Sequence, residues 1–417
     1  MGSGTLIELI ARGKQDISIT GNPQISYFKT VYHRHTNFAM EPIRNVFNET
    51  PDFGRKTTCY IDKKADLLSA MYLEIELPEL ARNVSWVNGI GNQIIKTVEI
   101  QIGGETIDKI TGSALDIYNE LITPQGIKPS YYNMIGKFFT YGINSQTGAV
   151  LLYVPLPFWF CRDIGRSLPL INLGYMDVSV IVELQPYDKC WFKKNIPSGT
   201  TYPTNIHVTS MTLLCNYIYL DVHERRKMLA TPKMEYLIEQ FQEPPQMAVI
   251  ANTSSFSSQI YLNHPVKEII WYYLSDYCAS LNDLNNYANV LNPFYINNPS
   301  QVSNELLVEP LTTVELKFNG NDRFEMLDSK YFRTVQIYEH HTSSADNYVY
   351  LFSFALNPEI NQPSGTCNFS KIDDIRMNLG LYQGPNQGIL SGNIYMLAVN
   401  YNILRIQSGM AGVLFSS

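Results

Sequence analysis

The chain has 417 residues, of which 45% are hydrophobic, 12% are aromatic and 17% are charged, and its formal net charge is −7. The length suggests two domains of roughly 200 residues each, and the charged share lies below the ~25% that is typical of soluble domains. The negative charge argues against direct coating of nucleic acid, which needs a positive field. The many Tyr and Phe side chains instead favour a protein that forms interfaces with partner chains.

The N-terminal segment is expected to be an arm rather than a targeting signal. It lacks the apolar stretch behind basic residues that marks a secretory signal, and Leu6 stands where a myristoylation motif needs Ser or Thr. The run Gly21-Asn22-Pro23 predicts a turn. We therefore assign residues 1–24 to the arm and expect residues 25–32 to enter the first strand. No run of about 18 apolar residues occurs, so no transmembrane helix is expected.

Strands with one buried face dominate the rest of the chain. Apolar and polar side chains alternate in five segments, and this period of two predicts half-buried β-strands. The segments are residues 71–77, 98–102, 178–184, 314–318 and 375–381. Clusters of Gly, Pro, Asn and Asp separate them, as in NGIGN at 88–92 and YQGPNQG at 382–388. The pattern predicts an all-β sandwich or barrel.

Helical signals are few. Ser113 is a candidate N-cap for a helical turn that includes residues 115–122, where apolar side chains share one face. A second segment, residues 221–229, is rich in charge and is stopped by Pro232, because the residue before a proline disfavours the helical region. Its place at mid-chain predicts a solvated helix between two domains rather than a nucleic-acid site.

The two halves of the chain resemble each other. VEIQIGGETID at 98–108 matches VELKFNGNDRF at 314–324, MDVSVIVEL at 176–184 matches DDIRMNLGL at 373–381, and Asn216-Tyr217 matches Asn400-Tyr401. The matches keep their order while the spacing between them changes, as expected of a duplicated β domain with variable loops. Two copies of an eight-stranded, two-sheet sandwich fit within this length.

No catalytic residue, cofactor or metal ligand is predicted. The chain has no GxSxG, HExxH or Walker-type motif, and IGGET at 102–106 ends a strand and predicts a hairpin turn. His33, His35 and the pair His340-His341 lack a spaced carboxylate or cysteine that would complete a metal set, so a structural or interfacial role is expected. A carbohydrate-binding or carbohydrate-cleaving sandwich stays as an alternative, but it would need convergent carboxylates or a calcium cluster.

The cysteines and the sequons give weaker signals. The six cysteines form no CxxC pair and are expected to be buried apolar residues in a reducing compartment. The sequons at Asn48, Asn83, Asn252 and Asn368 are candidate glycosylation sites. Host-type glycans are disfavoured without a secretory signal, whereas other routes of glycosylation stay open.

Several long blocks resemble the major capsid proteins of nucleocytoplasmic large DNA viruses. The first is IELIARGKQDISITGNPQISYFKTVYHRHTNFAMEP at 7–42. Further similar blocks are LIEQFQ at 237–242, NHPVKEIIW at 263–271, NGNDRF at 319–324, YFRTVQIY at 331–338, LFSFALNPEINQPSGTCNFSKID at 351–373 and NYNILRIQSGMAGVLF at 400–415. Together they span nearly the whole chain in the family's order.

The resemblance implies a double jelly roll: two consecutive eight-stranded jelly-roll β-sandwiches with a few short helices. The expected parts are an arm at 1–24, a first jelly roll at 25–222, an inter-domain helix and linker at 223–236, and a second jelly roll at 237–417. The resemblance also implies a structural protein without catalysis. Three copies would form a pseudo-hexameric capsomer, and capsomers would tile the icosahedral capsid of a large double-stranded DNA virus, assembled in the host cytoplasm.

The resemblance further implies partners. These are the chain itself, neighbouring capsomers, minor capsid and penton proteins, and an inner membrane layer reached through minor proteins, with no direct nucleic-acid contact. The arm is expected to face the virion interior, and its candidate assembly contacts are Lys14, Gln15, Asp16, Asn22, Arg34 and His35. A transient scaffold or a low-copy capsid paralogue with the same fold is the alternative reading.

Overall fold

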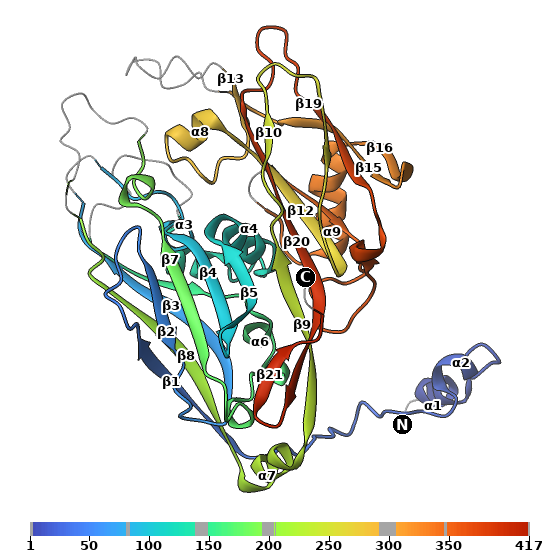
Figure 1. The fold of residues 1–417 in the computed structure, drawn as a ribbon. Coiled ribbons are helices and arrows are strands. Elements are labelled where there is room, and N and C mark those ends of the chain that lie inside the picture. Colours follow the sequence, from blue (N-terminus) through green and yellow to red (C-terminus); the bar gives the residue numbers. More distant parts are fainter. Residues whose placement is uncertain are drawn as a thin grey trace. The chain divides into compact units, whose positions relative to one another are not determined.

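The first half of the larger unit is a sandwich of two four-stranded sheets (Figure 1). The computed structural model describes residues 3–80, 84–137, 149–193, 204, 206–291, 306–345 and 348–415, in two compact units, Met1–Asn37 and Phe38–Ser417. The sheet orders are β1-β8-β3-β6 and β2-β7-β4-β5, all antiparallel. The strands are β1 Phe38–Val46, β2 Lys56–Tyr60, β3 Leu67–Leu77, β4 Ile95–Ile102, β5 Glu105–Thr111, β6 Val150–Pro155, β7 Val178–Leu184 and β8 Ser210–Leu220.

The second half repeats this arrangement. One sheet has the order β11-β19-β15-β16, and the other has the path β10-β20-β12-β17 with β9, β18 and β21 attached. The strands are β9 Lys233–Gln242, β10 Met247–Val249, β11 Ser255–Gln259, β12 Pro265–Ser275, β15 Leu311–Phe318, β16 Asn321–Asp328, β17 Val349–Ser353, β18 Cys367–Asn368, β19 Ile375–Leu381, β20 Gly392–Gln407 and β21 Met410–Val413. A small antiparallel two-stranded sheet of β13 Asn289–Leu291 and β14 Leu306–Val308 completes the described strands.

The predicted double jelly roll is confirmed. The five strands expected from alternation lie in β3, β4, β7, β15 and β19. The matched segments of the two halves also occupy equivalent places. The hairpin β4–β5 corresponds to β15–β16, β7 to β19, and β8 to β20, with the same neighbours in the sheets. The weak internal repeat in the sequence therefore corresponds to a repeated topology.

Strand β12 shows how the two jelly rolls pack together. Its side chains are buried on both faces, with only Pro265 half-buried. Ile269, Trp271 and Tyr273 belong to the core of the second jelly roll, whereas Ile270 and Tyr272 belong to the cluster that forms the core of the first. The near-continuous apolar run IIWYYL is explained by this position between two layers, because a strand covered on both faces loses its alternation.

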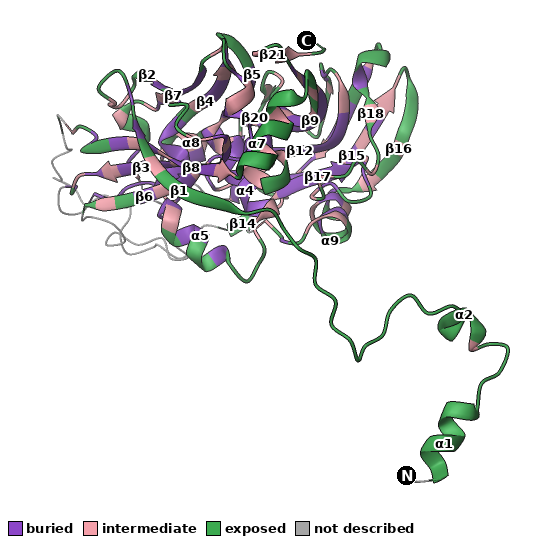
Figure 2. Ribbon diagram, turned by 90° about the horizontal axis from the view of Figure 1, so that it is seen from below, coloured by how far each residue is buried: buried purple, intermediate pink, exposed green. Residues whose placement is uncertain are grey.

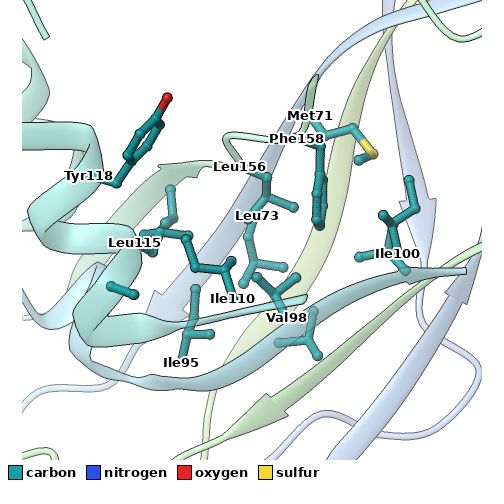
Figure 3. Close-up of a cluster of buried hydrophobic side chains, with 14 of the residues drawn as sticks. Met71, Leu73, Ile95, Val98, Ile100, Ile110, Leu115, Tyr118, Leu156 and Phe158 are labelled. Carbon is teal, nitrogen blue, oxygen red and sulfur yellow. The ribbon is translucent and has the colours of Figure 1, made fainter. Parts of the chain in front are cut away.

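Helix α4, Gly112–Ile122, closes the core of the first jelly roll beside the hairpin β4–β5 (Figure 3). Leu115 and Tyr118 on α4 are buried together with side chains of β3, β4 and β5. The predicted cap was wrong by two residues: Thr111, not Ser113, accepts the hydrogen bond from the amide of Ala114. Thr111 has extended backbone and precedes the first helical residue, as an N-cap requires.

Helix α7, Val222–Ala230, lies at mid-chain and contains no buried residue. This agrees with the predicted solvated helix at 221–229. Strand β9 begins at Lys233, so residues 233–236, expected as linker, already pair with β20. The other helices in the described part of the larger unit are α3 Ile90–Gln93, α5 Lys128–Ile135, α6 Trp159–Arg162, α8 Asp276–Ser280 and α9 Gln336–His340, with single turns η1 Ile164–Arg166, η2 Leu170–Asn172, η3 Tyr187–Lys189, η6 Phe369–Lys371 and the π-helical turn η5 Tyr331–Val335.

Buried charges link the two jelly rolls. The carboxylate of Glu239 on β9 forms ion pairs with three cations: Arg162 of α6, Arg166 of η1 at 3.3 Å (Nη1–Oε1) and Lys267 of β12 at 2.8 Å (Nζ–Oε2). We call these four residues the charged junction. Burial disfavours the Glu239 carboxylate, but Arg162 and Lys267 outweigh that effect and lower its pKa to about 2. Such a network holds its partners in one geometry because any unpaired member would be costly inside the protein.

The smaller unit carries two short helices, α1 Ser3–Ile10 and α2 Ile17–Thr20, neither with a buried residue (Figure 2). Residues 25–32 are not a strand, and the first strand begins at Phe38. The prediction failed because a strand needs a neighbour: β8 pairs with residues 38–46, and no described strand pairs with 25–32. High β-propensity alone does not form a strand. None of the described helices is long and apolar enough to span a membrane.

Candidate assembly surfaces

The polar residues predicted as assembly contacts all lie in the smaller unit. Lys14, Gln15, Asn22, Arg34 and His35 are exposed. Asp16 is half-buried by its own segment: its Oδ2 accepts a hydrogen bond from the amide of Gly13 at 2.7 Å, which closes the turn before α2. Five of the six side chains are therefore presented to solvent, whereas the carboxylate of Asp16 has a local structural role. Their role as assembly contacts stays a prediction.

The arm also exposes large apolar side chains, which are not among the residues predicted as assembly contacts. Leu6 and Ile10 of α1, four residues apart, are 47% and 79% exposed, and Phe28 is fully exposed. Large apolar side chains left uncovered in a contiguous segment mark interaction sites. Their signal was present in the sequence as Leu6, Leu9 and Ile10, which follow the i, i+3, i+4 spacing of one helix face.

A groove on the larger unit is a second candidate surface. It is open, has a volume of about 820 Å³, and is lined by residues of η5 and α9 together with Gln125 of the first jelly roll. Tyr338 in this groove is 87% exposed, and Val335 beside it is 37% exposed. Exposed aromatic and aliphatic side chains next to hydrogen-bonding groups are typical of interface centres.

The histidines singled out in the sequence divide into two kinds. His33 and His35 are exposed in the arm. His340 contacts the carbonyl oxygen of Leu356 through Nδ1 at 3.0 Å, and His341 is buried between two carboxylates. Within the described residues no group of His, Cys, Asp or Glu has the arrangement of a metal site. A further histidine, His207, is exposed and bonded to Asp52 at 2.7 Å (Nδ1–Oδ2).

The glycosylation candidates are exposed where they are described. Asn48, Asn252 and Asn368 lie at the surface, and Asn83 falls outside the described residues. The side-chain oxygens of Asn252 and Asn368 accept hydrogen bonds from the amides of Gly388 and Ser370. Glycosylation at any of the four remains a prediction.

The features that could suggest chemistry have structural explanations. IGGET forms the turn of the hairpin β4–β5, with Gly103 and Gly104 at positive φ as that turn requires. None of the six cysteines, all of which are described, forms a disulfide; Cys59, Cys190, Cys215 and Cys278 are buried as predicted, whereas Cys161 and Cys367, also expected to be buried, are half-buried. Burial raises the pKa of the Cys161 thiol to about 12, which keeps it in the unreactive thiol form.

Two family models match the chain in succession. The model for the major capsid protein N-terminus matches residues 26–221, and the model for the large eukaryotic DNA virus major capsid protein matches residues 224–412. Among curated proteins, the major capsid protein of Pyramimonas orientalis virus is 35% identical, and that of Phaeocystis pouchetii virus is 34% identical. Both alignments cover 100% of this chain and 100% of the relative.

Solved structures agree with these matches. A quasi-atomic model of the PBCV-1 virus capsid is similar with a TM-score of 0.80 and 28% identity, covering 94% of this chain and 100% of that one. The Faustovirus major capsid protein is similar with a TM-score of 0.74 at 13% identity, covering 97% and 96%. The second likeness supports the fold, and the first supports the fold together with the sequence relationship.

Proposed function

The chain belongs to the major capsid proteins of large eukaryotic DNA viruses, and on this premise we propose that three copies assemble into a pseudo-hexameric capsomer. The family is one of structural proteins rather than enzymes. The observation that carries the proposal is the repeated topology of the two jelly rolls in one chain. Three chains then supply six similar lobes, and a closed ring of three hides the surfaces between protomers.

The inter-roll packing supports this arrangement. Because β12 is buried on both faces and the charged junction links the jelly rolls, one chain forms a rigid pair of jelly rolls rather than two domains joined by a flexible linker. A rigid pair can repeat one geometry in every capsomer, as regular tiling of an icosahedral shell requires. Weak contacts between many capsomers then add up to a stable shell through multivalency.

We assign partner contacts to the arm, which we extend from residues 1–24 to residues 1–37 because the first strand begins at Phe38. In this assignment the arm contacts minor capsid or penton proteins on the interior side, with an inner membrane layer reached only through them. Its exposed apolar side chains supply most of the contact energy. Polar contacts orient the arm on its partner, and they come from Lys14, Gln15, Asn22, Arg34 and His35. The net charge of −7 speaks against direct contact with the genome.

The mass of the purified protein tests the trimer. Native mass spectrometry is expected to give a species of three times 47.5 kDa, and electron microscopy is expected to give a hexagonal outline. A well-folded protein that stays monomeric at all concentrations would overturn the proposal.

Copy number tests the role in the virion. A main capsid protein, assembled into particles in the host cytoplasm, is expected to be the most abundant shell component when purified particles are quantified. Curated relatives include a mimivirus protein named probable capsid protein 4, at 29% identity, so a low-copy paralogue is a specific alternative. A few copies per particle would favour the paralogue, and absence from mature particles would favour a scaffold.

A further inference from the structure

One loop of the second jelly roll contacts both jelly rolls without being part of a sheet. It comprises residues 354–363, between β17 and β18, and we call it the strap. On the side of the second jelly roll, the carbonyl oxygen of Pro358 accepts a hydrogen bond from Lys267 Nζ at 2.6 Å, and the amide of Phe354 donates to the carbonyl of Lys267 at 2.8 Å. Toward the first jelly roll, Asn361 donates to Asp163 and accepts from Arg166.

His341, directly after α9, connects the strap to β12. Its Nδ1 lies 3.1 Å from Oε1 of Glu359 on the strap, and its Nε2 lies 2.9 Å from Oε2 of Glu268 on β12. The side chains of His341 and Glu268 are 0% and 1% exposed, and that of Glu359 is 18% exposed. Glu359 also accepts a hydrogen bond from the amide of Thr342 at 3.0 Å.

With both carboxylates ionised, this geometry requires a protonated ring. An ionised carboxylate only accepts hydrogen bonds, so each of the two ring nitrogens facing one must donate. A neutral histidine has one donor, and its other nitrogen would place a lone pair against a carboxylate oxygen inside the protein. The charged groups acting on the ring are Glu268 and Glu359, and Lys267 and Glu239 act on Glu268 in turn.

We propose that His341 is a buried imidazolium that latches the strap to β12, and that loss of its proton at alkaline pH releases the strap. Release removes one of the links between the jelly rolls, because the strap contacts Arg166 and Asp163 of the first. The latch is independent of the capsomer proposal, since every group in it belongs to one chain.

The direction of the pH effect follows from the electrostatics. Burial lowers the pKa of His341, but Glu268 and Glu359 outweigh burial and raise it from its ordinary 6.5 to about 9. A raised histidine pKa means that the stabilising contribution is complete below about 6.5 and is lost as the pH rises through about 9.

The protonation state can be measured directly in the whole protein. The chain has seven histidines, so nitrogen NMR of ring-labelled histidine gives a sparse spectrum. One ring, absent in His341→Gln, is expected to show both nitrogens protonated at pH 7 and to titrate near pH 9. A neutral His341 at pH 7 would overturn the proposal, because the carboxylates would then be holding the proton.

Hydrogen exchange tests the release of the strap. After correction for the intrinsic pH dependence of exchange, the wild-type amides of residues 354–363, other than Pro358 and Pro363, are expected to exchange about 10- to 100-fold faster above the transition near pH 9 than at pH 7, as the loss of a charge-assisted hydrogen bond would give. Equal protection at pH 7 and pH 10 would overturn the latch.

Matched variants separate the latch from general damage. Glu359→Gln removes only the charge on the strap, so the strap is expected to exchange fast already at pH 7 while amides of β12 stay protected. His207→Gln is the control, because His207 also bonds to a carboxylate but is 67% exposed, and the strap is expected to behave as in the wild type. An alkaline transition of the strap that persists unchanged in Glu359→Gln would contradict the proposal.

Discussion

Lys267 of β12 and Glu239 of β9 form an ion pair with 2.8 Å between Nζ and Oε2, and their side chains are only 1% and 2% exposed. Two charges placed this deep are tolerated only while they are paired, because each loses its hydration. Glu239 also pairs with Arg162 and Arg166 of the first jelly roll, so this one carboxylate forms ion pairs with cations of both halves. The pair is therefore one of the contacts through which the stability of one jelly roll depends on the other.

Removing one member of this pair is expected to be strongly destabilising. Lys267→Met leaves Glu239 with fewer cations and leaves the carbonyl of Pro358 without its donor, so we expect a loss of about 3–5 kcal/mol in the free energy of unfolding. Denaturant unfolding monitored by tryptophan fluorescence measures it. The control is Lys233→Met, whose partner Glu235 forms an exposed pair, and its expected effect is much smaller because water screens the two charges. Equal losses of unfolding free energy in the two variants would show that the buried pair stabilises the protein no more than an exposed pair does.

Asp108 gives a pH dependence of opposite sign to that of an ordinary carboxylate. Its Oδ1 accepts a hydrogen bond from the amide of Phe241 at 2.9 Å, whereas Oδ2 is buried and has no hydrogen-bond partner among the described residues. Burial raises its pKa from 3.8 to about 7, although Phe241 and Arg162 act to lower it. The folded state thus prefers the protonated acid, and its stabilising contribution is complete below about 3.8 and lost as the pH rises through about 7.

The variant Asp108→Asn tests this, because Asn mimics the protonated acid and cannot ionise. The variant is expected to melt at a higher temperature than the wild type at pH 8 and at about the same temperature at pH 4. Asp177→Asn, at an 80% exposed position, is the control and should show no such difference between the two pH values. A variant that is less stable than the wild type at pH 8 would mean that the ionised carboxylate stabilises the junction.

The sequence predicted the architecture well because the jelly-roll strands obey a simple local rule. Alternation identified β3, β4, β7, β15 and β19, since each turns every second side chain, mostly apolar, into a core. The internal matches then predicted the repeat, because equivalent strands bury equivalent faces. Helix α7 between the two jelly rolls was predictable from a local rule too, because a solvated helix at a domain boundary is rich in charge and ends near a proline.

What the sequence did not predict depends on contacts between distant residues. Residues 25–32 have the composition of a strand but lack a partner in the described structure. Glu268 and His341 are 73 positions apart, and a histidine pair in the sequence gives no sign that one ring is buried between two carboxylates. Arg162 and Glu239 belong to different jelly rolls, so their pairing follows only from how those two bodies pack.

The two equivalent hairpins allow the duplication to be tested by substitution. Gly104 and Gly320 occupy corresponding turns with φ of +85° and +80°, and a β-carbon at either would meet nothing within 4 Å. The cost of Gly104→Ala or Gly320→Ala is then purely the left-handed backbone, about 1–2 kcal/mol each. Thermal unfolding is expected to show similar decreases for both. Gly126→Ala is the control, since Gly126 has equal space without a positive φ and should not lose stability.

The arm gives a prediction that separates capsomer formation from shell assembly. Deleting residues 1–22 is expected to leave the trimer intact in native mass spectrometry and to impair incorporation into particles, because the proposed contacts of the arm lie outside the capsomer. A truncated protein that fails to trimerise would show that the arm contributes to the capsomer itself.

Two substitution sets in the full-length chain then compare the kinds of contact. Replacing Leu6, Leu9 and Ile10 by Ser removes exposed apolar side chains of α1, and replacing Lys14, Arg34 and His35 by Ala removes the predicted polar contacts. Burying a Leu or Ile side chain contributes about 1.5–3 kcal/mol, whereas an exposed ion pair contributes about 0–1 kcal/mol. The apolar set is therefore expected to reduce incorporation more strongly than the polar set. A larger loss of incorporation in the polar set would instead show that the arm is recognised mainly through its polar and charged residues, as the sequence predicted.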